Sequence, residues 1–467
     1  MSDPWSPSPL LDLATGAGLL VVLIFVALFE WSGAAVFSEL ADALTLPLIA
    51  LLTLPAPWSR RAFVVVAGGL ILAAMATRPD WLEIIDHALR SASFIAAFFA
   101  ALAILRTAAA GSAAITRCGR FLAQQPPGRR YLALTLGGQL FGILLNYGAL
   151  ALLGGLAEAS ARREPDEEIR RHRIRRMLLA IQRGFVSTLP WSPIAFAVAI
   201  STSVIPGASW ADAVLPCLGS GLLLAGTGWA MDTIFKPKLS GPRPPRRTPE
   251  GGWASLWPLA LLLGLLVIGV IGLQMLGGVR TVAAVMVLAP TLALVWIAIQ
   301  SGRADAPSLG ERVYLYAARE LPGYRGEILL LVMAGFIGGL GGRLLAPLLA
   351  EAGIDLSALP AWTLLLALVW LIPLTGQLGM NPILTVSLLG PLLPEASTIG
   401  LEPVDLMVAA TAGWALSGAS SPYTATTLLI GALGGVSAHH VGLRWNGAYT
   451  LVCGTLLSGW VLLVAAI

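Results

Sequence analysis

The chain has 467 residues, of which 57% are hydrophobic and only 12% charged, with a formal net charge of +4. Globular domains carry about a quarter charged residues, so this composition excludes a soluble core and predicts a membrane protein. The basic residues gather in a few loops without interleaved aromatic residues, which argues against nucleic-acid binding. The three cysteines, Cys118, Cys217 and Cys453, lack ligand spacing, so we expect neither disulfides nor a zinc site.

The first half of the chain, residues 1–235, contains apolar runs long enough to span about 30 Å of hydrocarbon, or roughly 20 residues each. Within 15–105 we predict scaffold helices, which lie near Thr15–Val36, Leu40–Leu54, Ala62–Ala76 and Trp81–Leu105. A longer apolar stretch at 131–156 follows, and then helices at 177–200 and 210–234. The stretch at 131–156 is therefore longer than most of the predicted helices around it.

The second half, residues 253–467, repeats this order after a proline- and arginine-rich segment at 236–252, which we interpret as a solvated cytoplasmic linker. Its predicted elements are scaffold helices at 253–349, a long stretch at 361–393 and helices at 404–433 and 445–467. The same order of elements in both halves is typical of a transporter built from internal repeats.

Arginines indicate how the two long stretches sit in the membrane. They cluster on both sides of the first stretch, at 106–130 and 162–176, so the positive-inside rule places both flanks in the cytoplasm. That stretch is then a re-entrant hairpin with Asn146 near its tip. The loops that flank the second stretch carry no Lys or Arg, so its hairpin opens from the opposite face with Asn381 near its tip. The N-terminus is then cytoplasmic and the C-terminus periplasmic.

Short motifs also repeat between the halves. Gly138-Gln139-Leu140 is echoed by Gly376-Gln377-Leu378, and the segment from Gly184 to Pro193 is echoed by that from Gly413 to Pro422. Together these features predict an all-α polytopic membrane protein with two inverted-topology repeats. It would have about 11 transmembrane helices, two re-entrant hairpins and two broken helices.

The broken helices are predicted from prolines that have Ser and Thr around them. Pro190 and Pro193 fall near the middle of the helix at 177–200, and Pro422 near the middle of that at 404–433. A proline removes one backbone donor and frees a carbonyl one turn earlier. Broken helices point half-helix N-termini at an anion and bare carbonyls at a small cation. Ordinary proline kinks are the alternative for any single break, but their repetition favours a site.

We expect these breaks and the two hairpin tips to enclose a site near the midplane of the membrane. Its predicted solute-binding residues are Asn146, Tyr147, Thr188, Pro190, Ser192, Asn381, Pro382, Ser417, Ser420, Ser421 and Pro422. A coupling Na⁺ is predicted near Asn146, Ser187, Thr188, Asn381, Ser417 and Gly418. The alternatives are that the asparagines only cap half-helices and that aromatic side chains such as Tyr147 only pack against a wall.

Charged residues within the membrane are the remaining candidates for binding the solute or relaying protons. Arg183 lies seven residues before Pro190, and we expect it to snorkel to the interface rather than attract an anion. No Asp or Glu is expected at mid-membrane, so no carboxylate that relays protons is predicted. A cation held by carbonyl and hydroxyl oxygens, such as Na⁺, is then the favoured coupling ion, and no other cofactor is expected.

With the hairpins and broken helices in place, the chain resembles the ion transporter superfamily, and within it the divalent anion/sodium symporters and the arsenite and citrate carriers. The order of elements carries this resemblance over nearly the whole chain. Hairpin tips of those families commonly read Ser-Asn-Thr. Here they read Leu145-Asn146-Tyr147 and Met380-Asn381-Pro382, so only the asparagine carries over. The resemblance implies a mobile transport domain and a scaffold that usually dimerises.

The predicted function is a secondary active transporter that moves a small, anionic or organic-acid solute across the bacterial inner membrane. We expect coupling to Na⁺ or H⁺ and elevator-type alternating access. We also expect a homodimer formed through the scaffold helices, surrounded by lipid bilayer and without a nucleic-acid partner. A passive channel or a lipid flippase with the same fold is the alternative. A membrane enzyme is not expected, because no nucleophile, acid or metal cluster stands at an interface.

Overall fold

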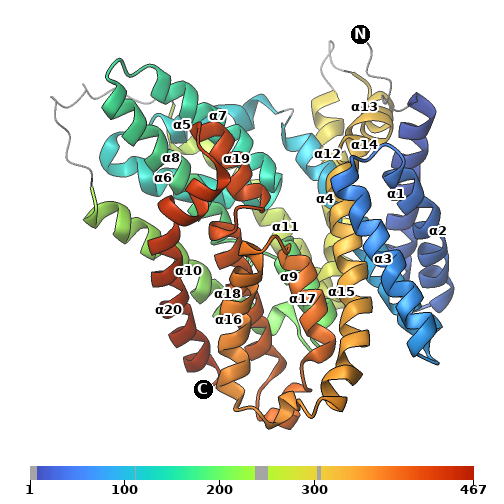
Figure 1. Cartoon of the computed structure of the whole chain (residues 1–467). Coiled ribbons are helices and arrows are strands. Elements are labelled where there is room, and N and C mark those ends of the chain that lie inside the picture. The colour runs from blue at the N-terminus through green and yellow to red at the C-terminus, as the bar shows by residue number, and fades with distance from the viewer. Residues whose placement is uncertain (1–7, 111, 237–250, 302–306) are drawn as a thin grey trace. The chain divides into compact units, whose positions relative to one another are not determined.

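A computed structural model of the chain describes residues 8–110, 112–236, 251–301 and 307–467. All regular secondary structure in these ranges is helical (Figure 1). Nine of the described helices are long and apolar enough to cross a membrane. They are α1 (Pro9–Ser32), α2 (Ala35–Thr53), α3 (Trp58–Thr77), α4 (Trp81–Ala110), α10 (Trp210–Ile234), α11 (Trp257–Gly277), α12 (Thr281–Ser301), α15 (Arg325–Glu351) and α20 (Gly447–Val464).

Two further helical segments are interrupted. α8 (Glu167–Val186) is followed after a break by α9 (Phe196–Val204), and α18 (Pro403–Ser420) is followed by α19 (Ala425–Gly434). The hairpin stretches are α6 (Pro127–Leu145) with α7 (Tyr147–Arg162), and α16 (Ala361–Gln377) with α17 (Pro382–Leu389). The prediction of an all-α polytopic membrane protein is confirmed.

The described chain also contains short helices that connect the longer ones. They are α5 (Ala113–Ala123), η1 (Trp253–Leu256), α13 (Leu309–Leu315), η2 (Tyr316–Glu320), α14 (Leu321–Gly323), η3 (Leu356–Ala358), η4 (Gly390–Leu392), η5 (Ala396–Ile399) and η6 (His440–Trp445). The predicted linker at 236–252 lies, apart from its two ends, outside the described residues.

The helices form two compact units. Unit 1 comprises residues 1–108, 266–358 and 383–394, and unit 2 comprises residues 109–265, 359–382 and 395–467. Unit 1 therefore holds most of the long helices at the start of each half, whereas α11 is divided between the two units. Unit 2 holds the first hairpin, both interrupted helices and α20.

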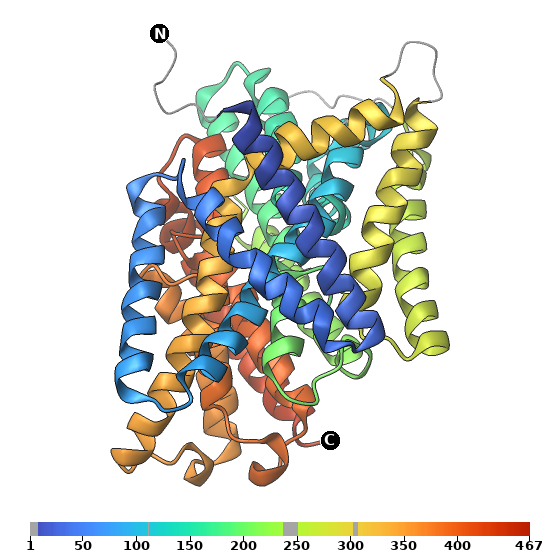
Figure 2. The same cartoon turned by 90° about the vertical axis from the view of Figure 1, so that its right-hand side faces the viewer.

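Unit 1 begins with α1 and α2, which lie side by side (dark blue in Figure 2). Gly33 ends α1 in the left-handed conformation, with φ of 67°, which glycine adopts without steric cost and which allows the immediate turn into α2. The other end of α1 packs on η2, where a Cβ added at Gly16 would overlap the carbonyl oxygen of Ala317. Ion pairs Asp12–Arg325 and Glu30–Arg280 join α1 to later segments of the unit.

One expectation from the sequence is wrong in unit 1. α2 begins at Ala35 rather than near Leu40, because the turn at Gly33 starts the new helix at once. Asp42 therefore lies two turns inside a membrane-spanning helix and is only 4% exposed. A carboxylate does lie within a membrane crossing, contrary to the prediction.

In unit 2, α6 packs against α7 and α8, and α16 packs against α18 and α20. Glycines allow these helices to approach closely, as is common between membrane helices. A Cβ at Gly184 of α8 would overlap the carbonyl oxygen of Thr135 of α6, and one at Gly413 of α18 would overlap that of Leu368 of α16. The echoed glycines of the two halves thus serve the same purpose in each half.

Candidate functional site

The first interruption occupies residues 187–195, between α8 and α9. Pro190 cannot donate a backbone hydrogen bond, so the helix cannot continue through it. The hydroxyl groups of Ser187 and Thr188 donate to the carbonyl oxygens of Gly184 and Phe185, each at 2.7 Å. Side chains therefore satisfy carbonyls in the last turn of α8, which is necessary where no water is available.

The second interruption, between α18 and α19, is held in the same manner. The hydroxyl of Thr426 donates to the carbonyl oxygen of Gly418, and that of Thr427 donates to the carbonyl oxygen of Ser421 at 2.6 Å. The hydroxyl of Thr424 also lies 2.9 Å from the Ser421 carbonyl oxygen. Each donating hydroxyl keeps lone pairs on its oxygen, so this break gathers several acceptor oxygens in a small volume.

Within unit 2, the first interruption contacts the last turn of α18, which leads into the second interruption. A Cβ added at Gly418 would lie 3.2 Å from Leu189 and 3.3 Å from Val186, so the first break packs directly on α18. The amide of Gln182, one turn before that break, donates to the carbonyl oxygen of Ala419 at 3.4 Å. The fold thus brings Gln182 and Ala419 together although they are 237 residues apart in the sequence.

Two predicted site residues carry buried hydroxyls without a partner. Ser192 is 1% exposed and Ser417 is 0% exposed. Neither hydroxyl has a hydrogen-bond partner among the described residues. Leaving a buried polar group unpaired costs about 1–3 kcal/mol, so such groups in a native protein call for an explanation. A bound cation or a polar solute group would supply the missing partner.

These hydroxyls fit the predicted Na⁺ better than a transition metal. No group of three or more His, Cys, Asp or Glu is assembled anywhere in the described ranges. Hard oxygen ligands are what small alkali and alkaline-earth cations prefer. The hydroxyls of Ser187, Thr188 and Ser417 provide such oxygens, as does the backbone around Gly418.

Sequence reasoning missed one pair of residues at the interruptions. Gln139 of α6 donates through its amide to the Ser187 hydroxyl at 3.0 Å, and Gln377 of α16 lies 3.4 Å from the Ser420 hydroxyl. Each glutamine belongs to the echoed Gly-Gln-Leu motif and reaches the interrupted helix of its own half. The repetition of that motif was the signal that could have identified them.

Asn146, the predicted tip of the first hairpin, lies at a break between two helices. Asn146 separates α6 from α7 and has φ of 49°, the sole positive φ of a non-glycine residue over the described ranges. Its side chain makes no capping bond to α7, which argues against a capping role. Tyr147 packs on Phe185 of α8 with ring centroids 5.6 Å apart. A strained backbone at such a position is typical of functional sites.

The remaining predicted residues lie at or beside the breaks. Pro422 and Ser421 are buried between α18 and α19, and the Ser421 hydroxyl donates to the carbonyl oxygen of Gly376 at 2.6 Å. Asn381 is half-buried and immediately precedes Pro382, the first residue of α17. The predicted approach of Asn146 to Asn381 stays a prediction.

Arg183 does not snorkel, contrary to the prediction. It is 5% exposed, and its guanidinium donates to Asn446 Oδ1 at 3.1 Å, to the Tyr131 hydroxyl at 3.3 Å and to the Trp445 carbonyl oxygen at 3.3 Å. The guanidinium carbon also lies 4.3 Å from the ring centroid of Tyr449. Neutral groups and an aromatic face thus hold this buried charge.

Asn446 is the centre of this network. It is 0% exposed, and while its oxygen accepts from Arg183, its amide nitrogen donates to Gln182 Oε1 at 2.9 Å. Two adjacent residues of α8 therefore fix both ends of one amide at the start of α20. Because Gln182 also reaches Ala419, the network connects α8, α18 and α20 next to both interruptions.

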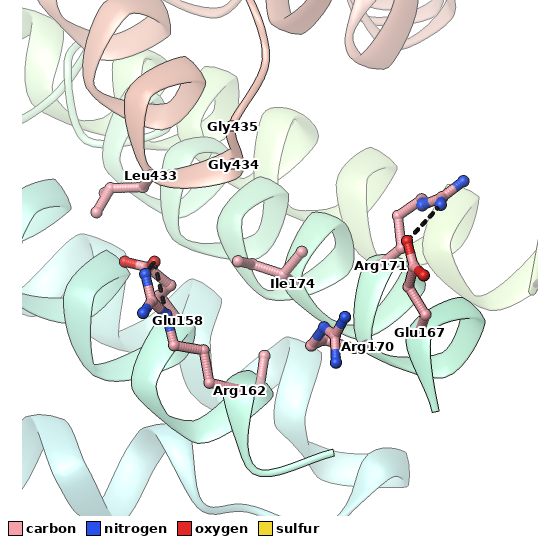
Figure 3. A pocket seen from close by; sticks show the side chains of 10 residues that line it. Glu158, Arg162, Glu167, Arg170, Arg171, Ile174, Leu433, Gly434 and Gly435 are labelled. Atoms are coloured by element: carbon pink, nitrogen blue, oxygen red, sulfur yellow. Dashed lines mark hydrogen bonds and ion pairs between the residues drawn. The ribbon is translucent and has the colours of Figure 1, made fainter. Parts of the chain in front are cut away.

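A separate cavity of about 300 Å³ lies at the ends of α7 and α19 and the beginning of α8 (Figure 3). Its charged lining residues pair along their own helices, Arg162 with Glu158 at 2.5 Å and Arg171 with Glu167 at 3.0 Å. Such solvent-exposed pairs contribute little, roughly 0–1 kcal/mol each. This cavity contains none of the residues of the interruptions.

No model of a known protein family matches the chain, and no curated protein matches it by sequence. Its fold is similar to two solved structures. One is the YdaH transporter of Alcanivorax borkumensis, with a TM-score of 0.56 and 16% identity over 88% of this chain and 98% of that chain. The other is MtrF of Neisseria gonorrhoeae, described with a class of antimetabolite efflux pumps, with a TM-score of 0.51 and 15% identity over 86% and 95% of the two chains. At these identities the likeness shows the fold.

Proposed function

We propose that the protein is a secondary active transporter of a small organic solute. The observation that supports this most strongly is the contact of Leu189 in the first interruption with Gly418 in the last turn of α18, together with the unpartnered buried hydroxyls of Ser192 and Ser417. Interrupted membrane helices that gather hydroxyls and free backbone groups are how transporters of this architecture bind solutes and ions. Both structural neighbours are described as transporters, which agrees with the proposal.

The chemistry of the interruptions favours an anionic or organic-acid solute. Each break presents the N-terminus of a second half-helix, at Phe196 and at Ala425, and helix N-termini attract negative charge. The hydroxyl oxygens beside them suit a small cation such as Na⁺. The description of MtrF with a class of antimetabolite efflux pumps adds antimetabolites, moved outward, to the solutes to be tested.

We further propose alternating access in which unit 2 moves as a body. Unit 2 contains both interrupted helices and their hydrogen-bonded network, so a solute held there would move with it. Unit 1 would be the scaffold and the dimer interface, in the inner membrane of a bacterium with the N-terminus in the cytoplasm. This arrangement is the one that a resemblance to the ion transporter superfamily would imply.

The experiment is a thermal-stabilisation screen of the purified protein against carboxylates, oxyanions and amino acids, with and without Na⁺. A ligand that binds only the folded state raises its stability by about 2.7 kcal/mol at a hundred times its dissociation constant. We expect stabilisation by an organic acid that is lost in Asn146→Leu and retained in the control variant Asp80→Asn. No stabilisation by any solute class, or equal stabilisation of Asn146→Leu, would contradict the assignment.

A further inference from the structure

Asp42 of α2 is a buried carboxylate that the solute site does not use. It belongs to unit 1, whereas the interrupted helices belong to unit 2. It is the eighth residue of a helix of 19 and is 4% exposed. An ionisable side chain within a membrane helix is costly, so its presence there indicates a function and a partner that can be named.

The partner is Ser93 of α4. Its hydroxyl oxygen lies 2.6 Å from Asp42 Oδ1 and 3.0 Å from the carbonyl oxygen of Arg90. A serine hydroxyl has one hydrogen, so it cannot donate to both acceptors at once. When Asp42 is ionised, Ser93 donates to the carboxylate. When Asp42 is protonated, its O–H donates to Ser93, whose hydrogen turns to the Arg90 carbonyl. Both protonation states are therefore fully hydrogen-bonded by the same atoms.

The surrounding charges leave Asp42 without a dedicated counter-ion. Arg90 Nε is 3.8 Å from Asp42 Oδ2, but its Nη2 is 2.9 Å from Asp86, and its side chain is 47% exposed. The hydroxyl of Ser38, one turn earlier on α2, is 3.4 Å from Asp42 Oδ2. An ionised Asp42 would be only partly compensated here, because Arg90 is shared between two carboxylates.

Most of the other titratable groups on the helices around Asp42 are exposed or have partners of their own. On α4, His87 lies one turn before Arg90, and on α2 itself Glu39 is exposed. The helices that pack against α2 carry charges with their own partners: Asp12 with Arg325, Glu30 with Arg280, Arg60 with the Gly326 carbonyl and Arg61 with the Leu54 carbonyl. On α15, Glu327, Arg343 and Glu351 are the remaining charged residues.

We propose that Asp42 and Ser93 form a proton-binding site in unit 1, at which the carboxylate takes up one proton and releases it again. The step needs only H⁺: the carboxylate oxygen gains the proton, the charge on the Asp42 side chain changes from −1 to 0, and Ser93 reverses its hydrogen bond. As the site that couples H⁺ to solute movement it rests on the proposed transport function. Proton binding by Asp42 itself does not depend on the proposed transport function.

The test is infrared difference spectroscopy of the purified full chain during a pH titration, following the C=O stretch of a protonated carboxyl group. We expect a titrating band in the wild type and in Asp80→Asn, an acid outside the membrane helices. Asp42→Asn should lack it. Histidine has no such band, so His87 cannot supply it, and His87→Gln should keep it. A band that is the same in Asp42→Asn as in the wild type would overturn the proposal.

Ser93→Ala covers the case in which Asp42→Asn does not fold. Without the hydroxyl that donates to the ionised carboxylate, the ionised form is disfavoured, so the band should persist to higher pH than in the wild type. An unshifted band in Ser93→Ala would contradict the role of Ser93. The coupling role has its own readout: solute uptake driven by a proton gradient should be lost in Asp42→Asn, and uptake driven as in the wild type would overturn that role alone.

Discussion

Leu189 of the first interruption lies against Gly418 in the last turn of α18, just before the second interruption, where an added Cβ would come within 3.2 Å of the Leu189 side chain. Because glycine has no side chain, the two interrupted helices can approach closely next to their breaks. Gly418→Val should force Leu189 and the α18 backbone apart, because overfilling a packed contact costs about 1–3 kcal/mol. We expect solute flux to fall about tenfold, the equivalent of roughly 1.4 kcal/mol in a barrier.

The matched control for that change is Gly155→Val on α7, where an added Cβ meets no atom within 4 Å. Both variants make the same Gly→Val change inside a helix and so change helix propensity alike, so a difference between them reports the contact at Gly418. Flux through reconstituted liposomes is the measurement. Equal flux for the two variants would show that the contact has no part in transport.

The two echoed glutamines should matter for transport more than for folding. Gln139→Leu and Gln377→Leu each remove a hydrogen bond to a serine of an interruption, at a cost of about 0.5–1.5 kcal/mol in stability. Gln274→Leu removes a similar bond, from Gln274 to the Thr281 hydroxyl at 2.6 Å, in unit 1. Thermal unfolding should change by similar amounts in all three, whereas flux should fall only in the first two. A uniform effect on flux would refute a specific role.

Because the Ser417 hydroxyl has no hydrogen-bond partner, its removal should raise the stability of the protein rather than lower it. Ser417→Ala removes a buried group that has no hydrogen bond, so the ligand-free protein should become more stable by about 1–3 kcal/mol. Flux should fall at the same time, because a ligand of the solute or cation is lost. Ser458→Ala is the control, since its hydroxyl accepts a bond from Trp370 at 2.9 Å and its loss should lower stability and spare flux. Ser417→Ala that loses stability without losing flux would contradict the assignment.

The hydrogen bond between Arg183 and Asn446 predicts that substitutions at these two positions have non-additive effects on stability. Arg183→Met should lower the free energy of unfolding by about 1.5–3 kcal/mol, because hydrogen bonds to a charged group are the stronger ones. Arg129→Met, at an exposed arginine, should change it by about 0.5 kcal/mol or less. Combining Arg183→Met with Asn446→Leu should fall short of additivity by at least about 0.5 kcal/mol. Strict additivity in this double-mutant cycle would show that the Arg183–Asn446 bond carries no energy.

Much of the architecture could be predicted from the sequence, because membrane helices follow from local apolar length and breaks follow from proline. Pro190 and Pro422 mark both interruptions, and Asn146 falls at the turn between α6 and α7 as predicted. These are properties of single segments. They need no knowledge of what packs against them.

The errors concern residues whose role depends on distant partners. Arg183 is buried because Asn446, 263 residues away, accepts its hydrogen bond, and no local pattern reveals that. Asp42 was hidden by a five-residue difference in where α2 begins, and its partner Ser93 lies on another helix. Gln139 and Gln377 were visible as a repeated motif, yet their function at the interruptions required the packing of α6 on α8 and of α16 on α18.

The central claim is that the two interruptions in unit 2 form the path of a coupled transporter. The most direct measurement is concentrative uptake, into liposomes, of a solute found by the stabilisation screen, with and without an imposed Na⁺ or H⁺ gradient. The account predicts accumulation above equilibrium only with a gradient, and its loss in Gly418→Val but not in Gly155→Val. Solute that merely equilibrates whatever the gradient, or accumulation unchanged in Gly418→Val, would contradict it.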